Sequence, residues 1–136
     1  MIFDTSIVLQ ILKDKNFVQD IRDRVDNEIK ITSITVYELL RGAAYLKVAK
    51  YSEKELNIIL SLVSELDVVP FGRKEAKIAA YIWGKLKLKG TVVSDADVLI
   101  ASVCAANRQK LLTADEDFRK IKEVYGRFEV EFVAPH

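Results

Sequence analysis

The stretch that most constrains this chain is residues 93–106, VSDADVLIASVCAA, which is almost entirely apolar after two early acids. A helix that is apolar on all sides lies in the middle of a domain, covered by its neighbours. Ser94 is a good N-cap residue, which places Asp95 and Asp97 in the first turn of this helix. Two acids at the head of a core helix either complement the helix dipole or point into a site.

Hydrophobic patterning predicts short strands that alternate with helices along all 136 residues. Strands are expected at residues 1–3, 28–32, 67–70, 110–113 and 129–133. Helices are expected after a cap at Thr5 or Ser6 and over about 16–25, 35–47, 52–66, 73–89, 94–106 and 118–123. This order predicts one α/β domain, a three-layer α/β/α sandwich whose central, mostly parallel sheet has about five strands.

The segment around residues 67–90 carries three local predictions. Pro70 ends the third strand, so this strand is expected near an edge of the sheet. Trp83 lies on the same helical face as Ala79 and Leu86, which predicts that the indole packs in the core. Gly90 follows the last helical residue and is expected to end the helix as a C′ glycine.

The composition excludes several kinds of site. The single cysteine, Cys104, rules out an internal disulfide and a cysteine-based zinc site, and is expected to pack in the core helix. The single histidine, His136, rules out a histidine metal cluster and disfavours a Ser/His mechanism. With a net charge of +1, the chain would need a local basic patch to bind a polyanion. No signal peptide or membrane span is recognisable, so a cytoplasmic location is expected.

Four acids are expected at the same end of the sheet. Asp4 follows the first strand, Glu38 lies in the helix after the second, Asp97 heads the core helix, and Asp115 follows the fourth strand. Ligands of open α/β sheets bind outside the carboxyl ends of the strands. Carboxylates that lie close together repel one another unless a cation neutralises them. The pattern therefore predicts a site for a hard divalent metal with oxygen ligands.

Each of these acids also has a purely structural interpretation. Asp97 can complement the dipole of its helix, and Asp4 can be a turn residue at the end of a strand. Asp115 can cap the short helix that follows it, and Glu38 can complete a capping box with Thr35. Their shared position at one end of the sheet favours a site over four unrelated roles.

Four motifs, in order, resemble those of PIN-domain ribonucleases, and their spacing and the chain length resemble small VapC-type toxins of toxin–antitoxin pairs. The motifs are Asp4-Thr5-Ser6, Glu38-Leu39-Leu40-Arg41-Gly42-Ala43, Gly90 with the segment 95–102 (DADVLIAS), and the segment 112–118 (LTADEDF). The resemblance covers the whole chain. It implies a PIN-like fold, hydrolysis of RNA phosphodiester bonds with Mg²⁺ or Mn²⁺ as cofactor, a VapB-type antitoxin partner and a homodimer.

Carried over by position, the resemblance makes Asp4, Glu38, Asp97 and Asp115 the catalytic acids. The metal site is expected at Asp4, Asp97 and Asp115, with Asp4 and Asp97 in direct contact, and with Glu38 and Asp115 holding metal-bound waters or a second ion. Some relatives have asparagine at the position of Asp115, so Asp115 and Asp117 share the fourth role, with Asp115 favoured. The residues expected in supporting roles are Thr5, Ser6, Arg41, Asp95, Thr113 and Asp117.

Metal-assisted hydrolysis suits the residues that this chain offers. A divalent cation lowers the pKa of bound water and neutralises phosphate oxygens, which removes the need for a histidine base. Arg41 lies one turn after Glu38 and can anchor a phosphate, restrain Glu38, or be an ordinary surface residue. The lysine run at residues 85–89 can bind RNA or be a solvated face. The aromatics expected at a homodimer interface are Tyr45, Tyr51 and Tyr81.

Other classes of function fit parts of the pattern. A haloacid-dehalogenase-like phosphatase would have a second aspartate two residues after Asp4, where Ser6 stands. A receiver domain would have a paired acid near the first strand and a lysine at the end of a late strand, and neither is present. An RNA-processing nuclease without a toxin role, and a non-catalytic metal- or partner-binding module of the same fold, remain open alternatives.

Overall fold

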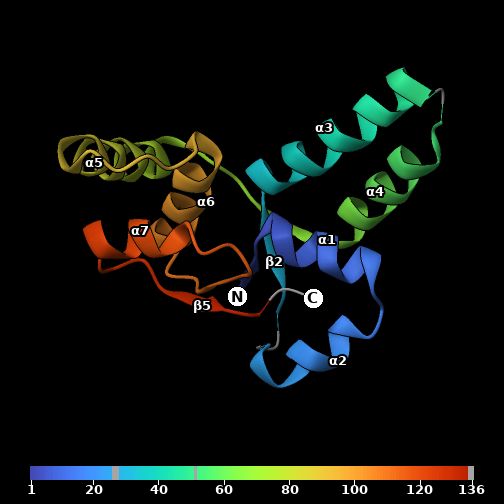
Figure 1. Ribbon diagram of the computed structural model, residues 1–136, viewed down its shortest axis with the longest axis horizontal. Coiled ribbons are helices and arrows are strands. Elements are labelled where there is room, and N and C mark those ends of the chain that lie inside the picture. The colour runs from blue at the N-terminus through green and yellow to red at the C-terminus, as the bar shows by residue number, and fades with distance from the viewer. Residues whose placement is uncertain (26–27, 51, 135–136) are drawn as a thin grey trace.

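A parallel β-sheet lies between two layers of helices (Figure 1). The computed structural model describes residues 1–25, 28–50 and 52–134. Within these residues the sheet has five strands, all parallel, in the order β3-β2-β1-β4-β5. The strands are β1 (Ile2–Phe3), β2 (Lys30–Thr32), β3 (Asp67–Val69), β4 (Leu111–Thr113) and β5 (Val130–Phe132). The predicted sandwich is confirmed, and β3 occupies an edge as Pro70 indicated.

The helices follow the strands in the predicted order. They are α1 (Thr5–Lys13), α2 (Phe17–Ile21), the 3₁₀ helix η1 (Arg22–Arg24), α3 (Ser33–Lys50), α4 (Lys54–Glu65), α5 (Arg73–Lys89), α6 (Asp95–Ala106) and α7 (Phe118–Val124). Among the described residues, none of these helices combines the length and apolarity needed to cross a bilayer. The prediction for Tyr51 lies outside the described residues.

Alternate side chains of the central strands separate the hydrophobic interior into two cores. Ile2 and Leu111 point toward α5, α6 and α7, which lie on the left in Figure 1. Phe3 and Leu112 point the other way, toward α1, α2, α3 and α4 on the right. Neighbouring residues of a strand face opposite sides of the sheet, so two-residue and three-residue strands suffice to anchor both layers.

Helix α6 is the buried helix that its sequence predicts. Most residues from Val98 to Cys104 are buried between the sheet and α5. Ser94 caps the helix as expected, because its hydroxyl accepts a hydrogen bond from the backbone N–H of Asp97 at 3.2 Å. Cys104 is fully buried, and burial raises the pKa of its thiol, which fits a packing role.

The prediction that Trp83 packs in the core is wrong, because its side chain is 52% exposed. Helix α5 buries a neighbouring face through Glu75, Ala79, Ile82 and Leu86. The Glu75 carboxylate accepts hydrogen bonds from the Gly72 backbone N–H and the Asn107 amide, both at 3.0 Å. These bonds hold the charged Glu75 side chain inward. The buried face of α5 therefore includes Ile82 and not Trp83, and the indole is half exposed. Gly90 ends the helix with φ 74°, as predicted.

The predicted caps of two other helices are also wrong, and the difference matters for the site. Asp4, rather than Thr5 or Ser6, occupies the N-cap position of α1. Helix α3 begins at Ser33, and the Thr32 hydroxyl accepts a hydrogen bond from the backbone N–H of Thr35 at 3.1 Å. Glu38 therefore lies beyond the first turn and does not cap this helix. The Thr5 and Ser6 hydroxyls and the Glu38 carboxylate, which are expected from the sequence to cap helices, instead form hydrogen bonds with side chains of the site.

Candidate active site

The predicted acids gather where the sheet order changes direction. From β1 the chain moves outward through β2 and β3, and it then returns to add β4 on the other side of β1. In open α/β sheets the crevice at such a switch point is the usual ligand site. Asp4 follows β1 and Asp115 follows β4, so both lie at this crevice. Asp97 enters from the first turn of α6, and Glu38 from the early part of α3.

Asp4 is buried and is held by hydroxyl groups from two segments. Its Oδ2 accepts hydrogen bonds from the Ser6 hydroxyl at 2.8 Å and from the Thr113 hydroxyl at 2.7 Å. The Thr113 oxygen also accepts the backbone N–H of Asp115 at 3.0 Å. Burial raises the pKa of Asp4, and these hydroxyls partly offset that rise by stabilising the charged carboxylate. Thr113 thus couples the end of β1 to the loop after β4.

Glu38 is held at both of its carboxylate oxygens. The Thr5 hydroxyl donates a hydrogen bond to Oε1 at 2.8 Å and lies 3.1 Å from the buried Thr35 hydroxyl. An Arg41 guanidinium nitrogen lies 3.7 Å from Oε2, and the guanidinium sits over the Tyr37 ring at 5.2 Å. The geometry therefore supports the interpretation that Arg41 restrains Glu38.

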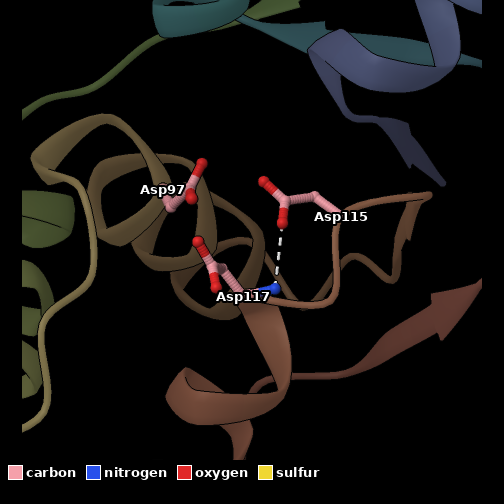
Figure 2. Close-up of side chains that lie close together, drawn as sticks. All are labelled: Asp97, Asp115 and Asp117. Carbon is pink, nitrogen blue, oxygen red and sulfur yellow. Dashed lines mark hydrogen bonds between the residues drawn. The ribbon is translucent and has the colours of Figure 1, made fainter.

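Three aspartates form the tightest group of acids (Figure 2). Asp97, Asp115 and Asp117 each offer a carboxylate oxygen within 4.8 Å of the others. Figure 2 shows Asp97 reaching from α6 toward the loop after β4, which carries the other two. The Oδ1 atom of Asp115 accepts the backbone N–H of Asp117 at 2.9 Å, and Lys120 pairs with Asp117 at 3.1 Å. The backbone of this loop therefore fixes the position of Asp115.

The electrostatics of this group favour a cation. The pKa of Asp97 is raised to about 7, first by burial and then by the charges of Asp115, Asp4 and Glu38. Without a counter-ion, the site therefore retains a proton near neutral pH. Its donors are all carboxylate and hydroxyl oxygens, the ligand type of Mg²⁺ and Mn²⁺. The residues present fit a divalent metal of that kind.

The structure places most of the predicted site residues together, with one exception. The exception is Asp95, which is exposed and lines a shallow pocket beside Trp83 and α5. Asp117 joins Asp97 and Asp115 in the tightest group, whereas Asp4 acts on Asp97 from outside that group.

Two buried hydroxyl residues near Glu38 were missed by the sequence reasoning, Thr32 and Thr35. Their hydroxyl oxygens lie 3.4 Å apart. The signal was present in the sequence, since Thr35 stands three residues before Glu38 and thus near it on a helix. The same spacing also fits a capping box, so it does not by itself indicate a role of Thr35 beside Glu38.

Comparison with known proteins agrees with the fold and the motifs. Residues 1–124 match the family described as PIN domain. The chain belongs to the PIN-domain family. The resemblance drawn from the four acidic motifs is thereby confirmed.

Relatives of this PIN domain include named ribonucleases. The chain is 36% identical over 103 residues to Ribonuclease VapC3 of Methanocaldococcus jannaschii, covering 75% of this chain and 95% of that protein. It is 30% identical over 97 residues to Ribonuclease VapC2 of Rickettsia felis, covering 71% and 70%. The structure also superposes on DNA-bound VapBC from Salmonella typhimurium with a TM-score of 0.79, 23% identity and 96% of each chain covered, which shows a shared fold.

The raised pKa of Asp97 predicts an unusual pH dependence of stability in the metal-free protein. Between the ordinary pKa of 3.8 and the folded value of about 7, the folded state binds more protons than the unfolded state. The free energy of unfolding in EDTA should therefore fall as pH rises from about 4 to about 7, and Asp4 acts in the same direction.

Asp97→Asn should flatten this dependence and raise the melting temperature at pH 8 by a few degrees above that of the wild type. Thermal unfolding in EDTA across this pH range measures both effects. Asp95→Asn, a charge change in the same helical turn but outside the cluster, is the matched control and should keep the wild-type slope. Equal slopes in wild type and Asp97→Asn would contradict the raised pKa assigned to Asp97.

Proposed function

We propose that this PIN domain is a divalent-metal-dependent endoribonuclease and the toxin of a VapBC-type toxin–antitoxin pair. The observation that carries the proposal is the gathering of Asp4, Glu38, Asp97 and Asp115 at the switch point of the sheet, in a chain 36% identical to a protein named Ribonuclease VapC3. Because RNA is the proposed substrate, a cytoplasmic location is part of this proposal.

The proposed cofactor is Mg²⁺ or Mn²⁺. Asp97 and Asp115 belong both to the predicted ligand set and to the tightest group of carboxylates. Asp4 is the third proposed ligand, because its charge acts on Asp97, and Asp117 joins them as a further oxygen donor. A bound cation supplies neutralisation of phosphate oxygens and a lower pKa for a coordinated water.

The side chains around these acids have positioning roles in the proposed reaction. Ser6 and Thr113 fix one Asp4 oxygen, so the carboxylate keeps one orientation. Thr5 fixes Oε1 of Glu38, which leaves Glu38 placed to accept a proton from the attacking water. Arg41, exposed at the rim, can bind a phosphate oxygen of the incoming RNA.

RNA cleavage tests this proposal. The wild type should cut a labelled single-stranded RNA in Mg²⁺ or Mn²⁺ and should not cut it in EDTA. Asp97→Asn should lower the rate by more than about 100-fold, because it removes a proposed ligand, and Thr113→Val should lower it about 10-fold to 100-fold through loss of support for Asp4. Asp95→Asn should cut at the wild-type rate. Cleavage that survives EDTA, or that Asp97→Asn leaves undiminished, would contradict the proposal.

An apolar groove next to the acids is the proposed docking site of the antitoxin. It has a volume of about 560 Å³, lies between α1, α3 and α4, and reaches Thr5 and Glu38 at one end. Its walls carry exposed or partly exposed apolar side chains, among them Leu9, Leu12 and Ile58. An apolar segment of a partner that fills this groove would end beside the carboxylates and could block access of RNA to them.

Ile58→Glu should weaken retention of a co-expressed VapB-type partner at least about tenfold, because it places a charge in the groove. Val48→Glu is the matched control, since Val48 is highly exposed and does not line the groove. Quantitative co-purification measures the effect, and equal retention by both variants would rule out this groove. The homodimer also remains a proposal, to which Tyr45 contributes an exposed ring.

A further inference from the structure

A second groove, between α5 and the end of α7, combines basic and aromatic side chains. It has a volume of about 460 Å³, which is enough to hold a nucleotide-sized group. Its polar and aromatic lining comes from two segments that are about 40 residues apart in the sequence. From α5 come Lys77, Tyr81 and Lys85, and from the loop after α7 come Tyr125 and Arg127.

The groove carries uncompensated positive charge. Lys77, Lys85 and Arg127 are exposed, and none of them forms an ion pair with another described residue. No acidic side chain is among the described residues that line the groove. At its edge, Lys89 of α5 and Glu123 of α7 pair at 2.9 Å and neutralise each other. A net charge of +1 for the whole chain makes this local excess a distinct feature.

The two tyrosines of the groove are held in place next to its basic side chains. The rings of Tyr81 and Tyr125 meet edge to face, with centroids 6.1 Å apart. Tyr81 is 54% exposed, and the Lys85 ammonium lies 5.0 Å from its ring centroid. The ammonium of Lys122 donates to the carbonyls of Gly126 and Phe128, each at 2.7 Å, which fixes the loop that carries Arg127. The groove is therefore preorganised.

We propose that this groove, which we call the α5–α7 groove, binds a segment of single-stranded RNA outside the acidic site. Lysine and arginine would neutralise backbone phosphates, and the exposed tyrosine would stack with a base, a combination that holds single strands without sequence preference. An acidic peptide would use the charges but would have no need for the aromatic rings. The charges together with the rings therefore favour RNA.

The position of the groove suits a substrate that also reaches the acids. Helix α7 begins directly after Asp117 and ends at Val124 in the groove, and its seven residues span about 10 Å. A single strand of a few nucleotides is long enough to cover that distance. One strand can thus lie in both places. This inference rests on the proposed function for the identity of the substrate, and its test measures binding independently of cleavage.

Binding of a labelled single-stranded RNA of about 12 nucleotides tests the proposal by fluorescence anisotropy, in an Asp97→Asn background that leaves the RNA uncut. Lys77→Gln/Lys85→Gln/Arg127→Gln should weaken binding at least about tenfold at low salt. It should also reduce the slope of log affinity against log salt by about 2, since three phosphate contacts are lost. The control Lys13→Gln/Lys54→Gln/Lys87→Gln makes the same charge change at exposed lysines outside the groove and should stay within about twofold.

A second pair of variants tests the contribution of the aromatic ring to RNA binding. Tyr81→Ala should weaken RNA binding about fivefold or more through loss of stacking, whereas Trp83→Ala, at an exposed aromatic residue of the same helix that does not line the groove, should not. Thermal unfolding checks that all variants are folded. Equal RNA affinity in the groove and control variants would overturn the proposal. It would also be overturned if an oligoglutamate peptide bound more tightly than the RNA and did so equally well in Tyr81→Ala. Groove-dependent binding in a wild type that cuts no RNA would keep this inference and reject the nuclease.

Discussion

Burial and mutual repulsion both disfavour the charged form of the carboxylates at one end of the sheet, and the fold has to hold them there. The pKa of Asp97 is raised to about 7, first by burial and then by the charges of Asp115, Asp4 and Glu38. A folded protein retains such an arrangement only if the surrounding structure holds the acids in place. Here the support comes from hydroxyl groups, namely Ser6 and Thr113 on Asp4 and Thr5 on Glu38.

The short strands explain how so small a domain positions these groups. Ile2 and Leu111 anchor one helical layer while Phe3 and Leu112 anchor the other, so the next residues of both segments emerge at the same edge. The buried α6 helix is fixed between the sheet and α5, which brings Asp97 to that edge with little freedom to move away. Packing energy from apolar contacts thus offsets the electrostatic cost of the site.

The order of elements and the acidic positions could be predicted because each depends on local sequence. The positions of the strands, the Ser94 cap and the Gly90 stop follow from residues that are neighbours in the chain. The exposure of Trp83 could not be predicted, because the face of α5 that is buried depends on a hydrogen bond between Glu75 and Asn107, which is distant in the sequence. Membership of Asp117 in the tightest cluster depends on the turn that Asp115 makes with it.

The two grooves lay beyond prediction for the same reason. The sequence showed a lysine run at residues 85–89 but gave no sign that Lys85 would share a groove with Arg127 and Tyr125. Only one lysine of that run lines the groove, while Lys89 is paired with Glu123. Helical rotation and the packing of α7 on α5 decide which charges remain available. A charge run in a sequence therefore says little until the helices are placed.

Titration of Mn²⁺ into the metal-free protein, followed by calorimetry, measures whether the carboxylate cluster holds a divalent cation. We expect one site at the carboxylate cluster, with an affinity that rises as pH increases through about 7, because the metal displaces the proton held by Asp97. Asp97→Asn should weaken binding more than about tenfold, and Asp95→Asn should leave it unchanged. Mn²⁺ affinity that is equal in wild type and Asp97→Asn, or independent of pH, would contradict a metal site built on Asp97.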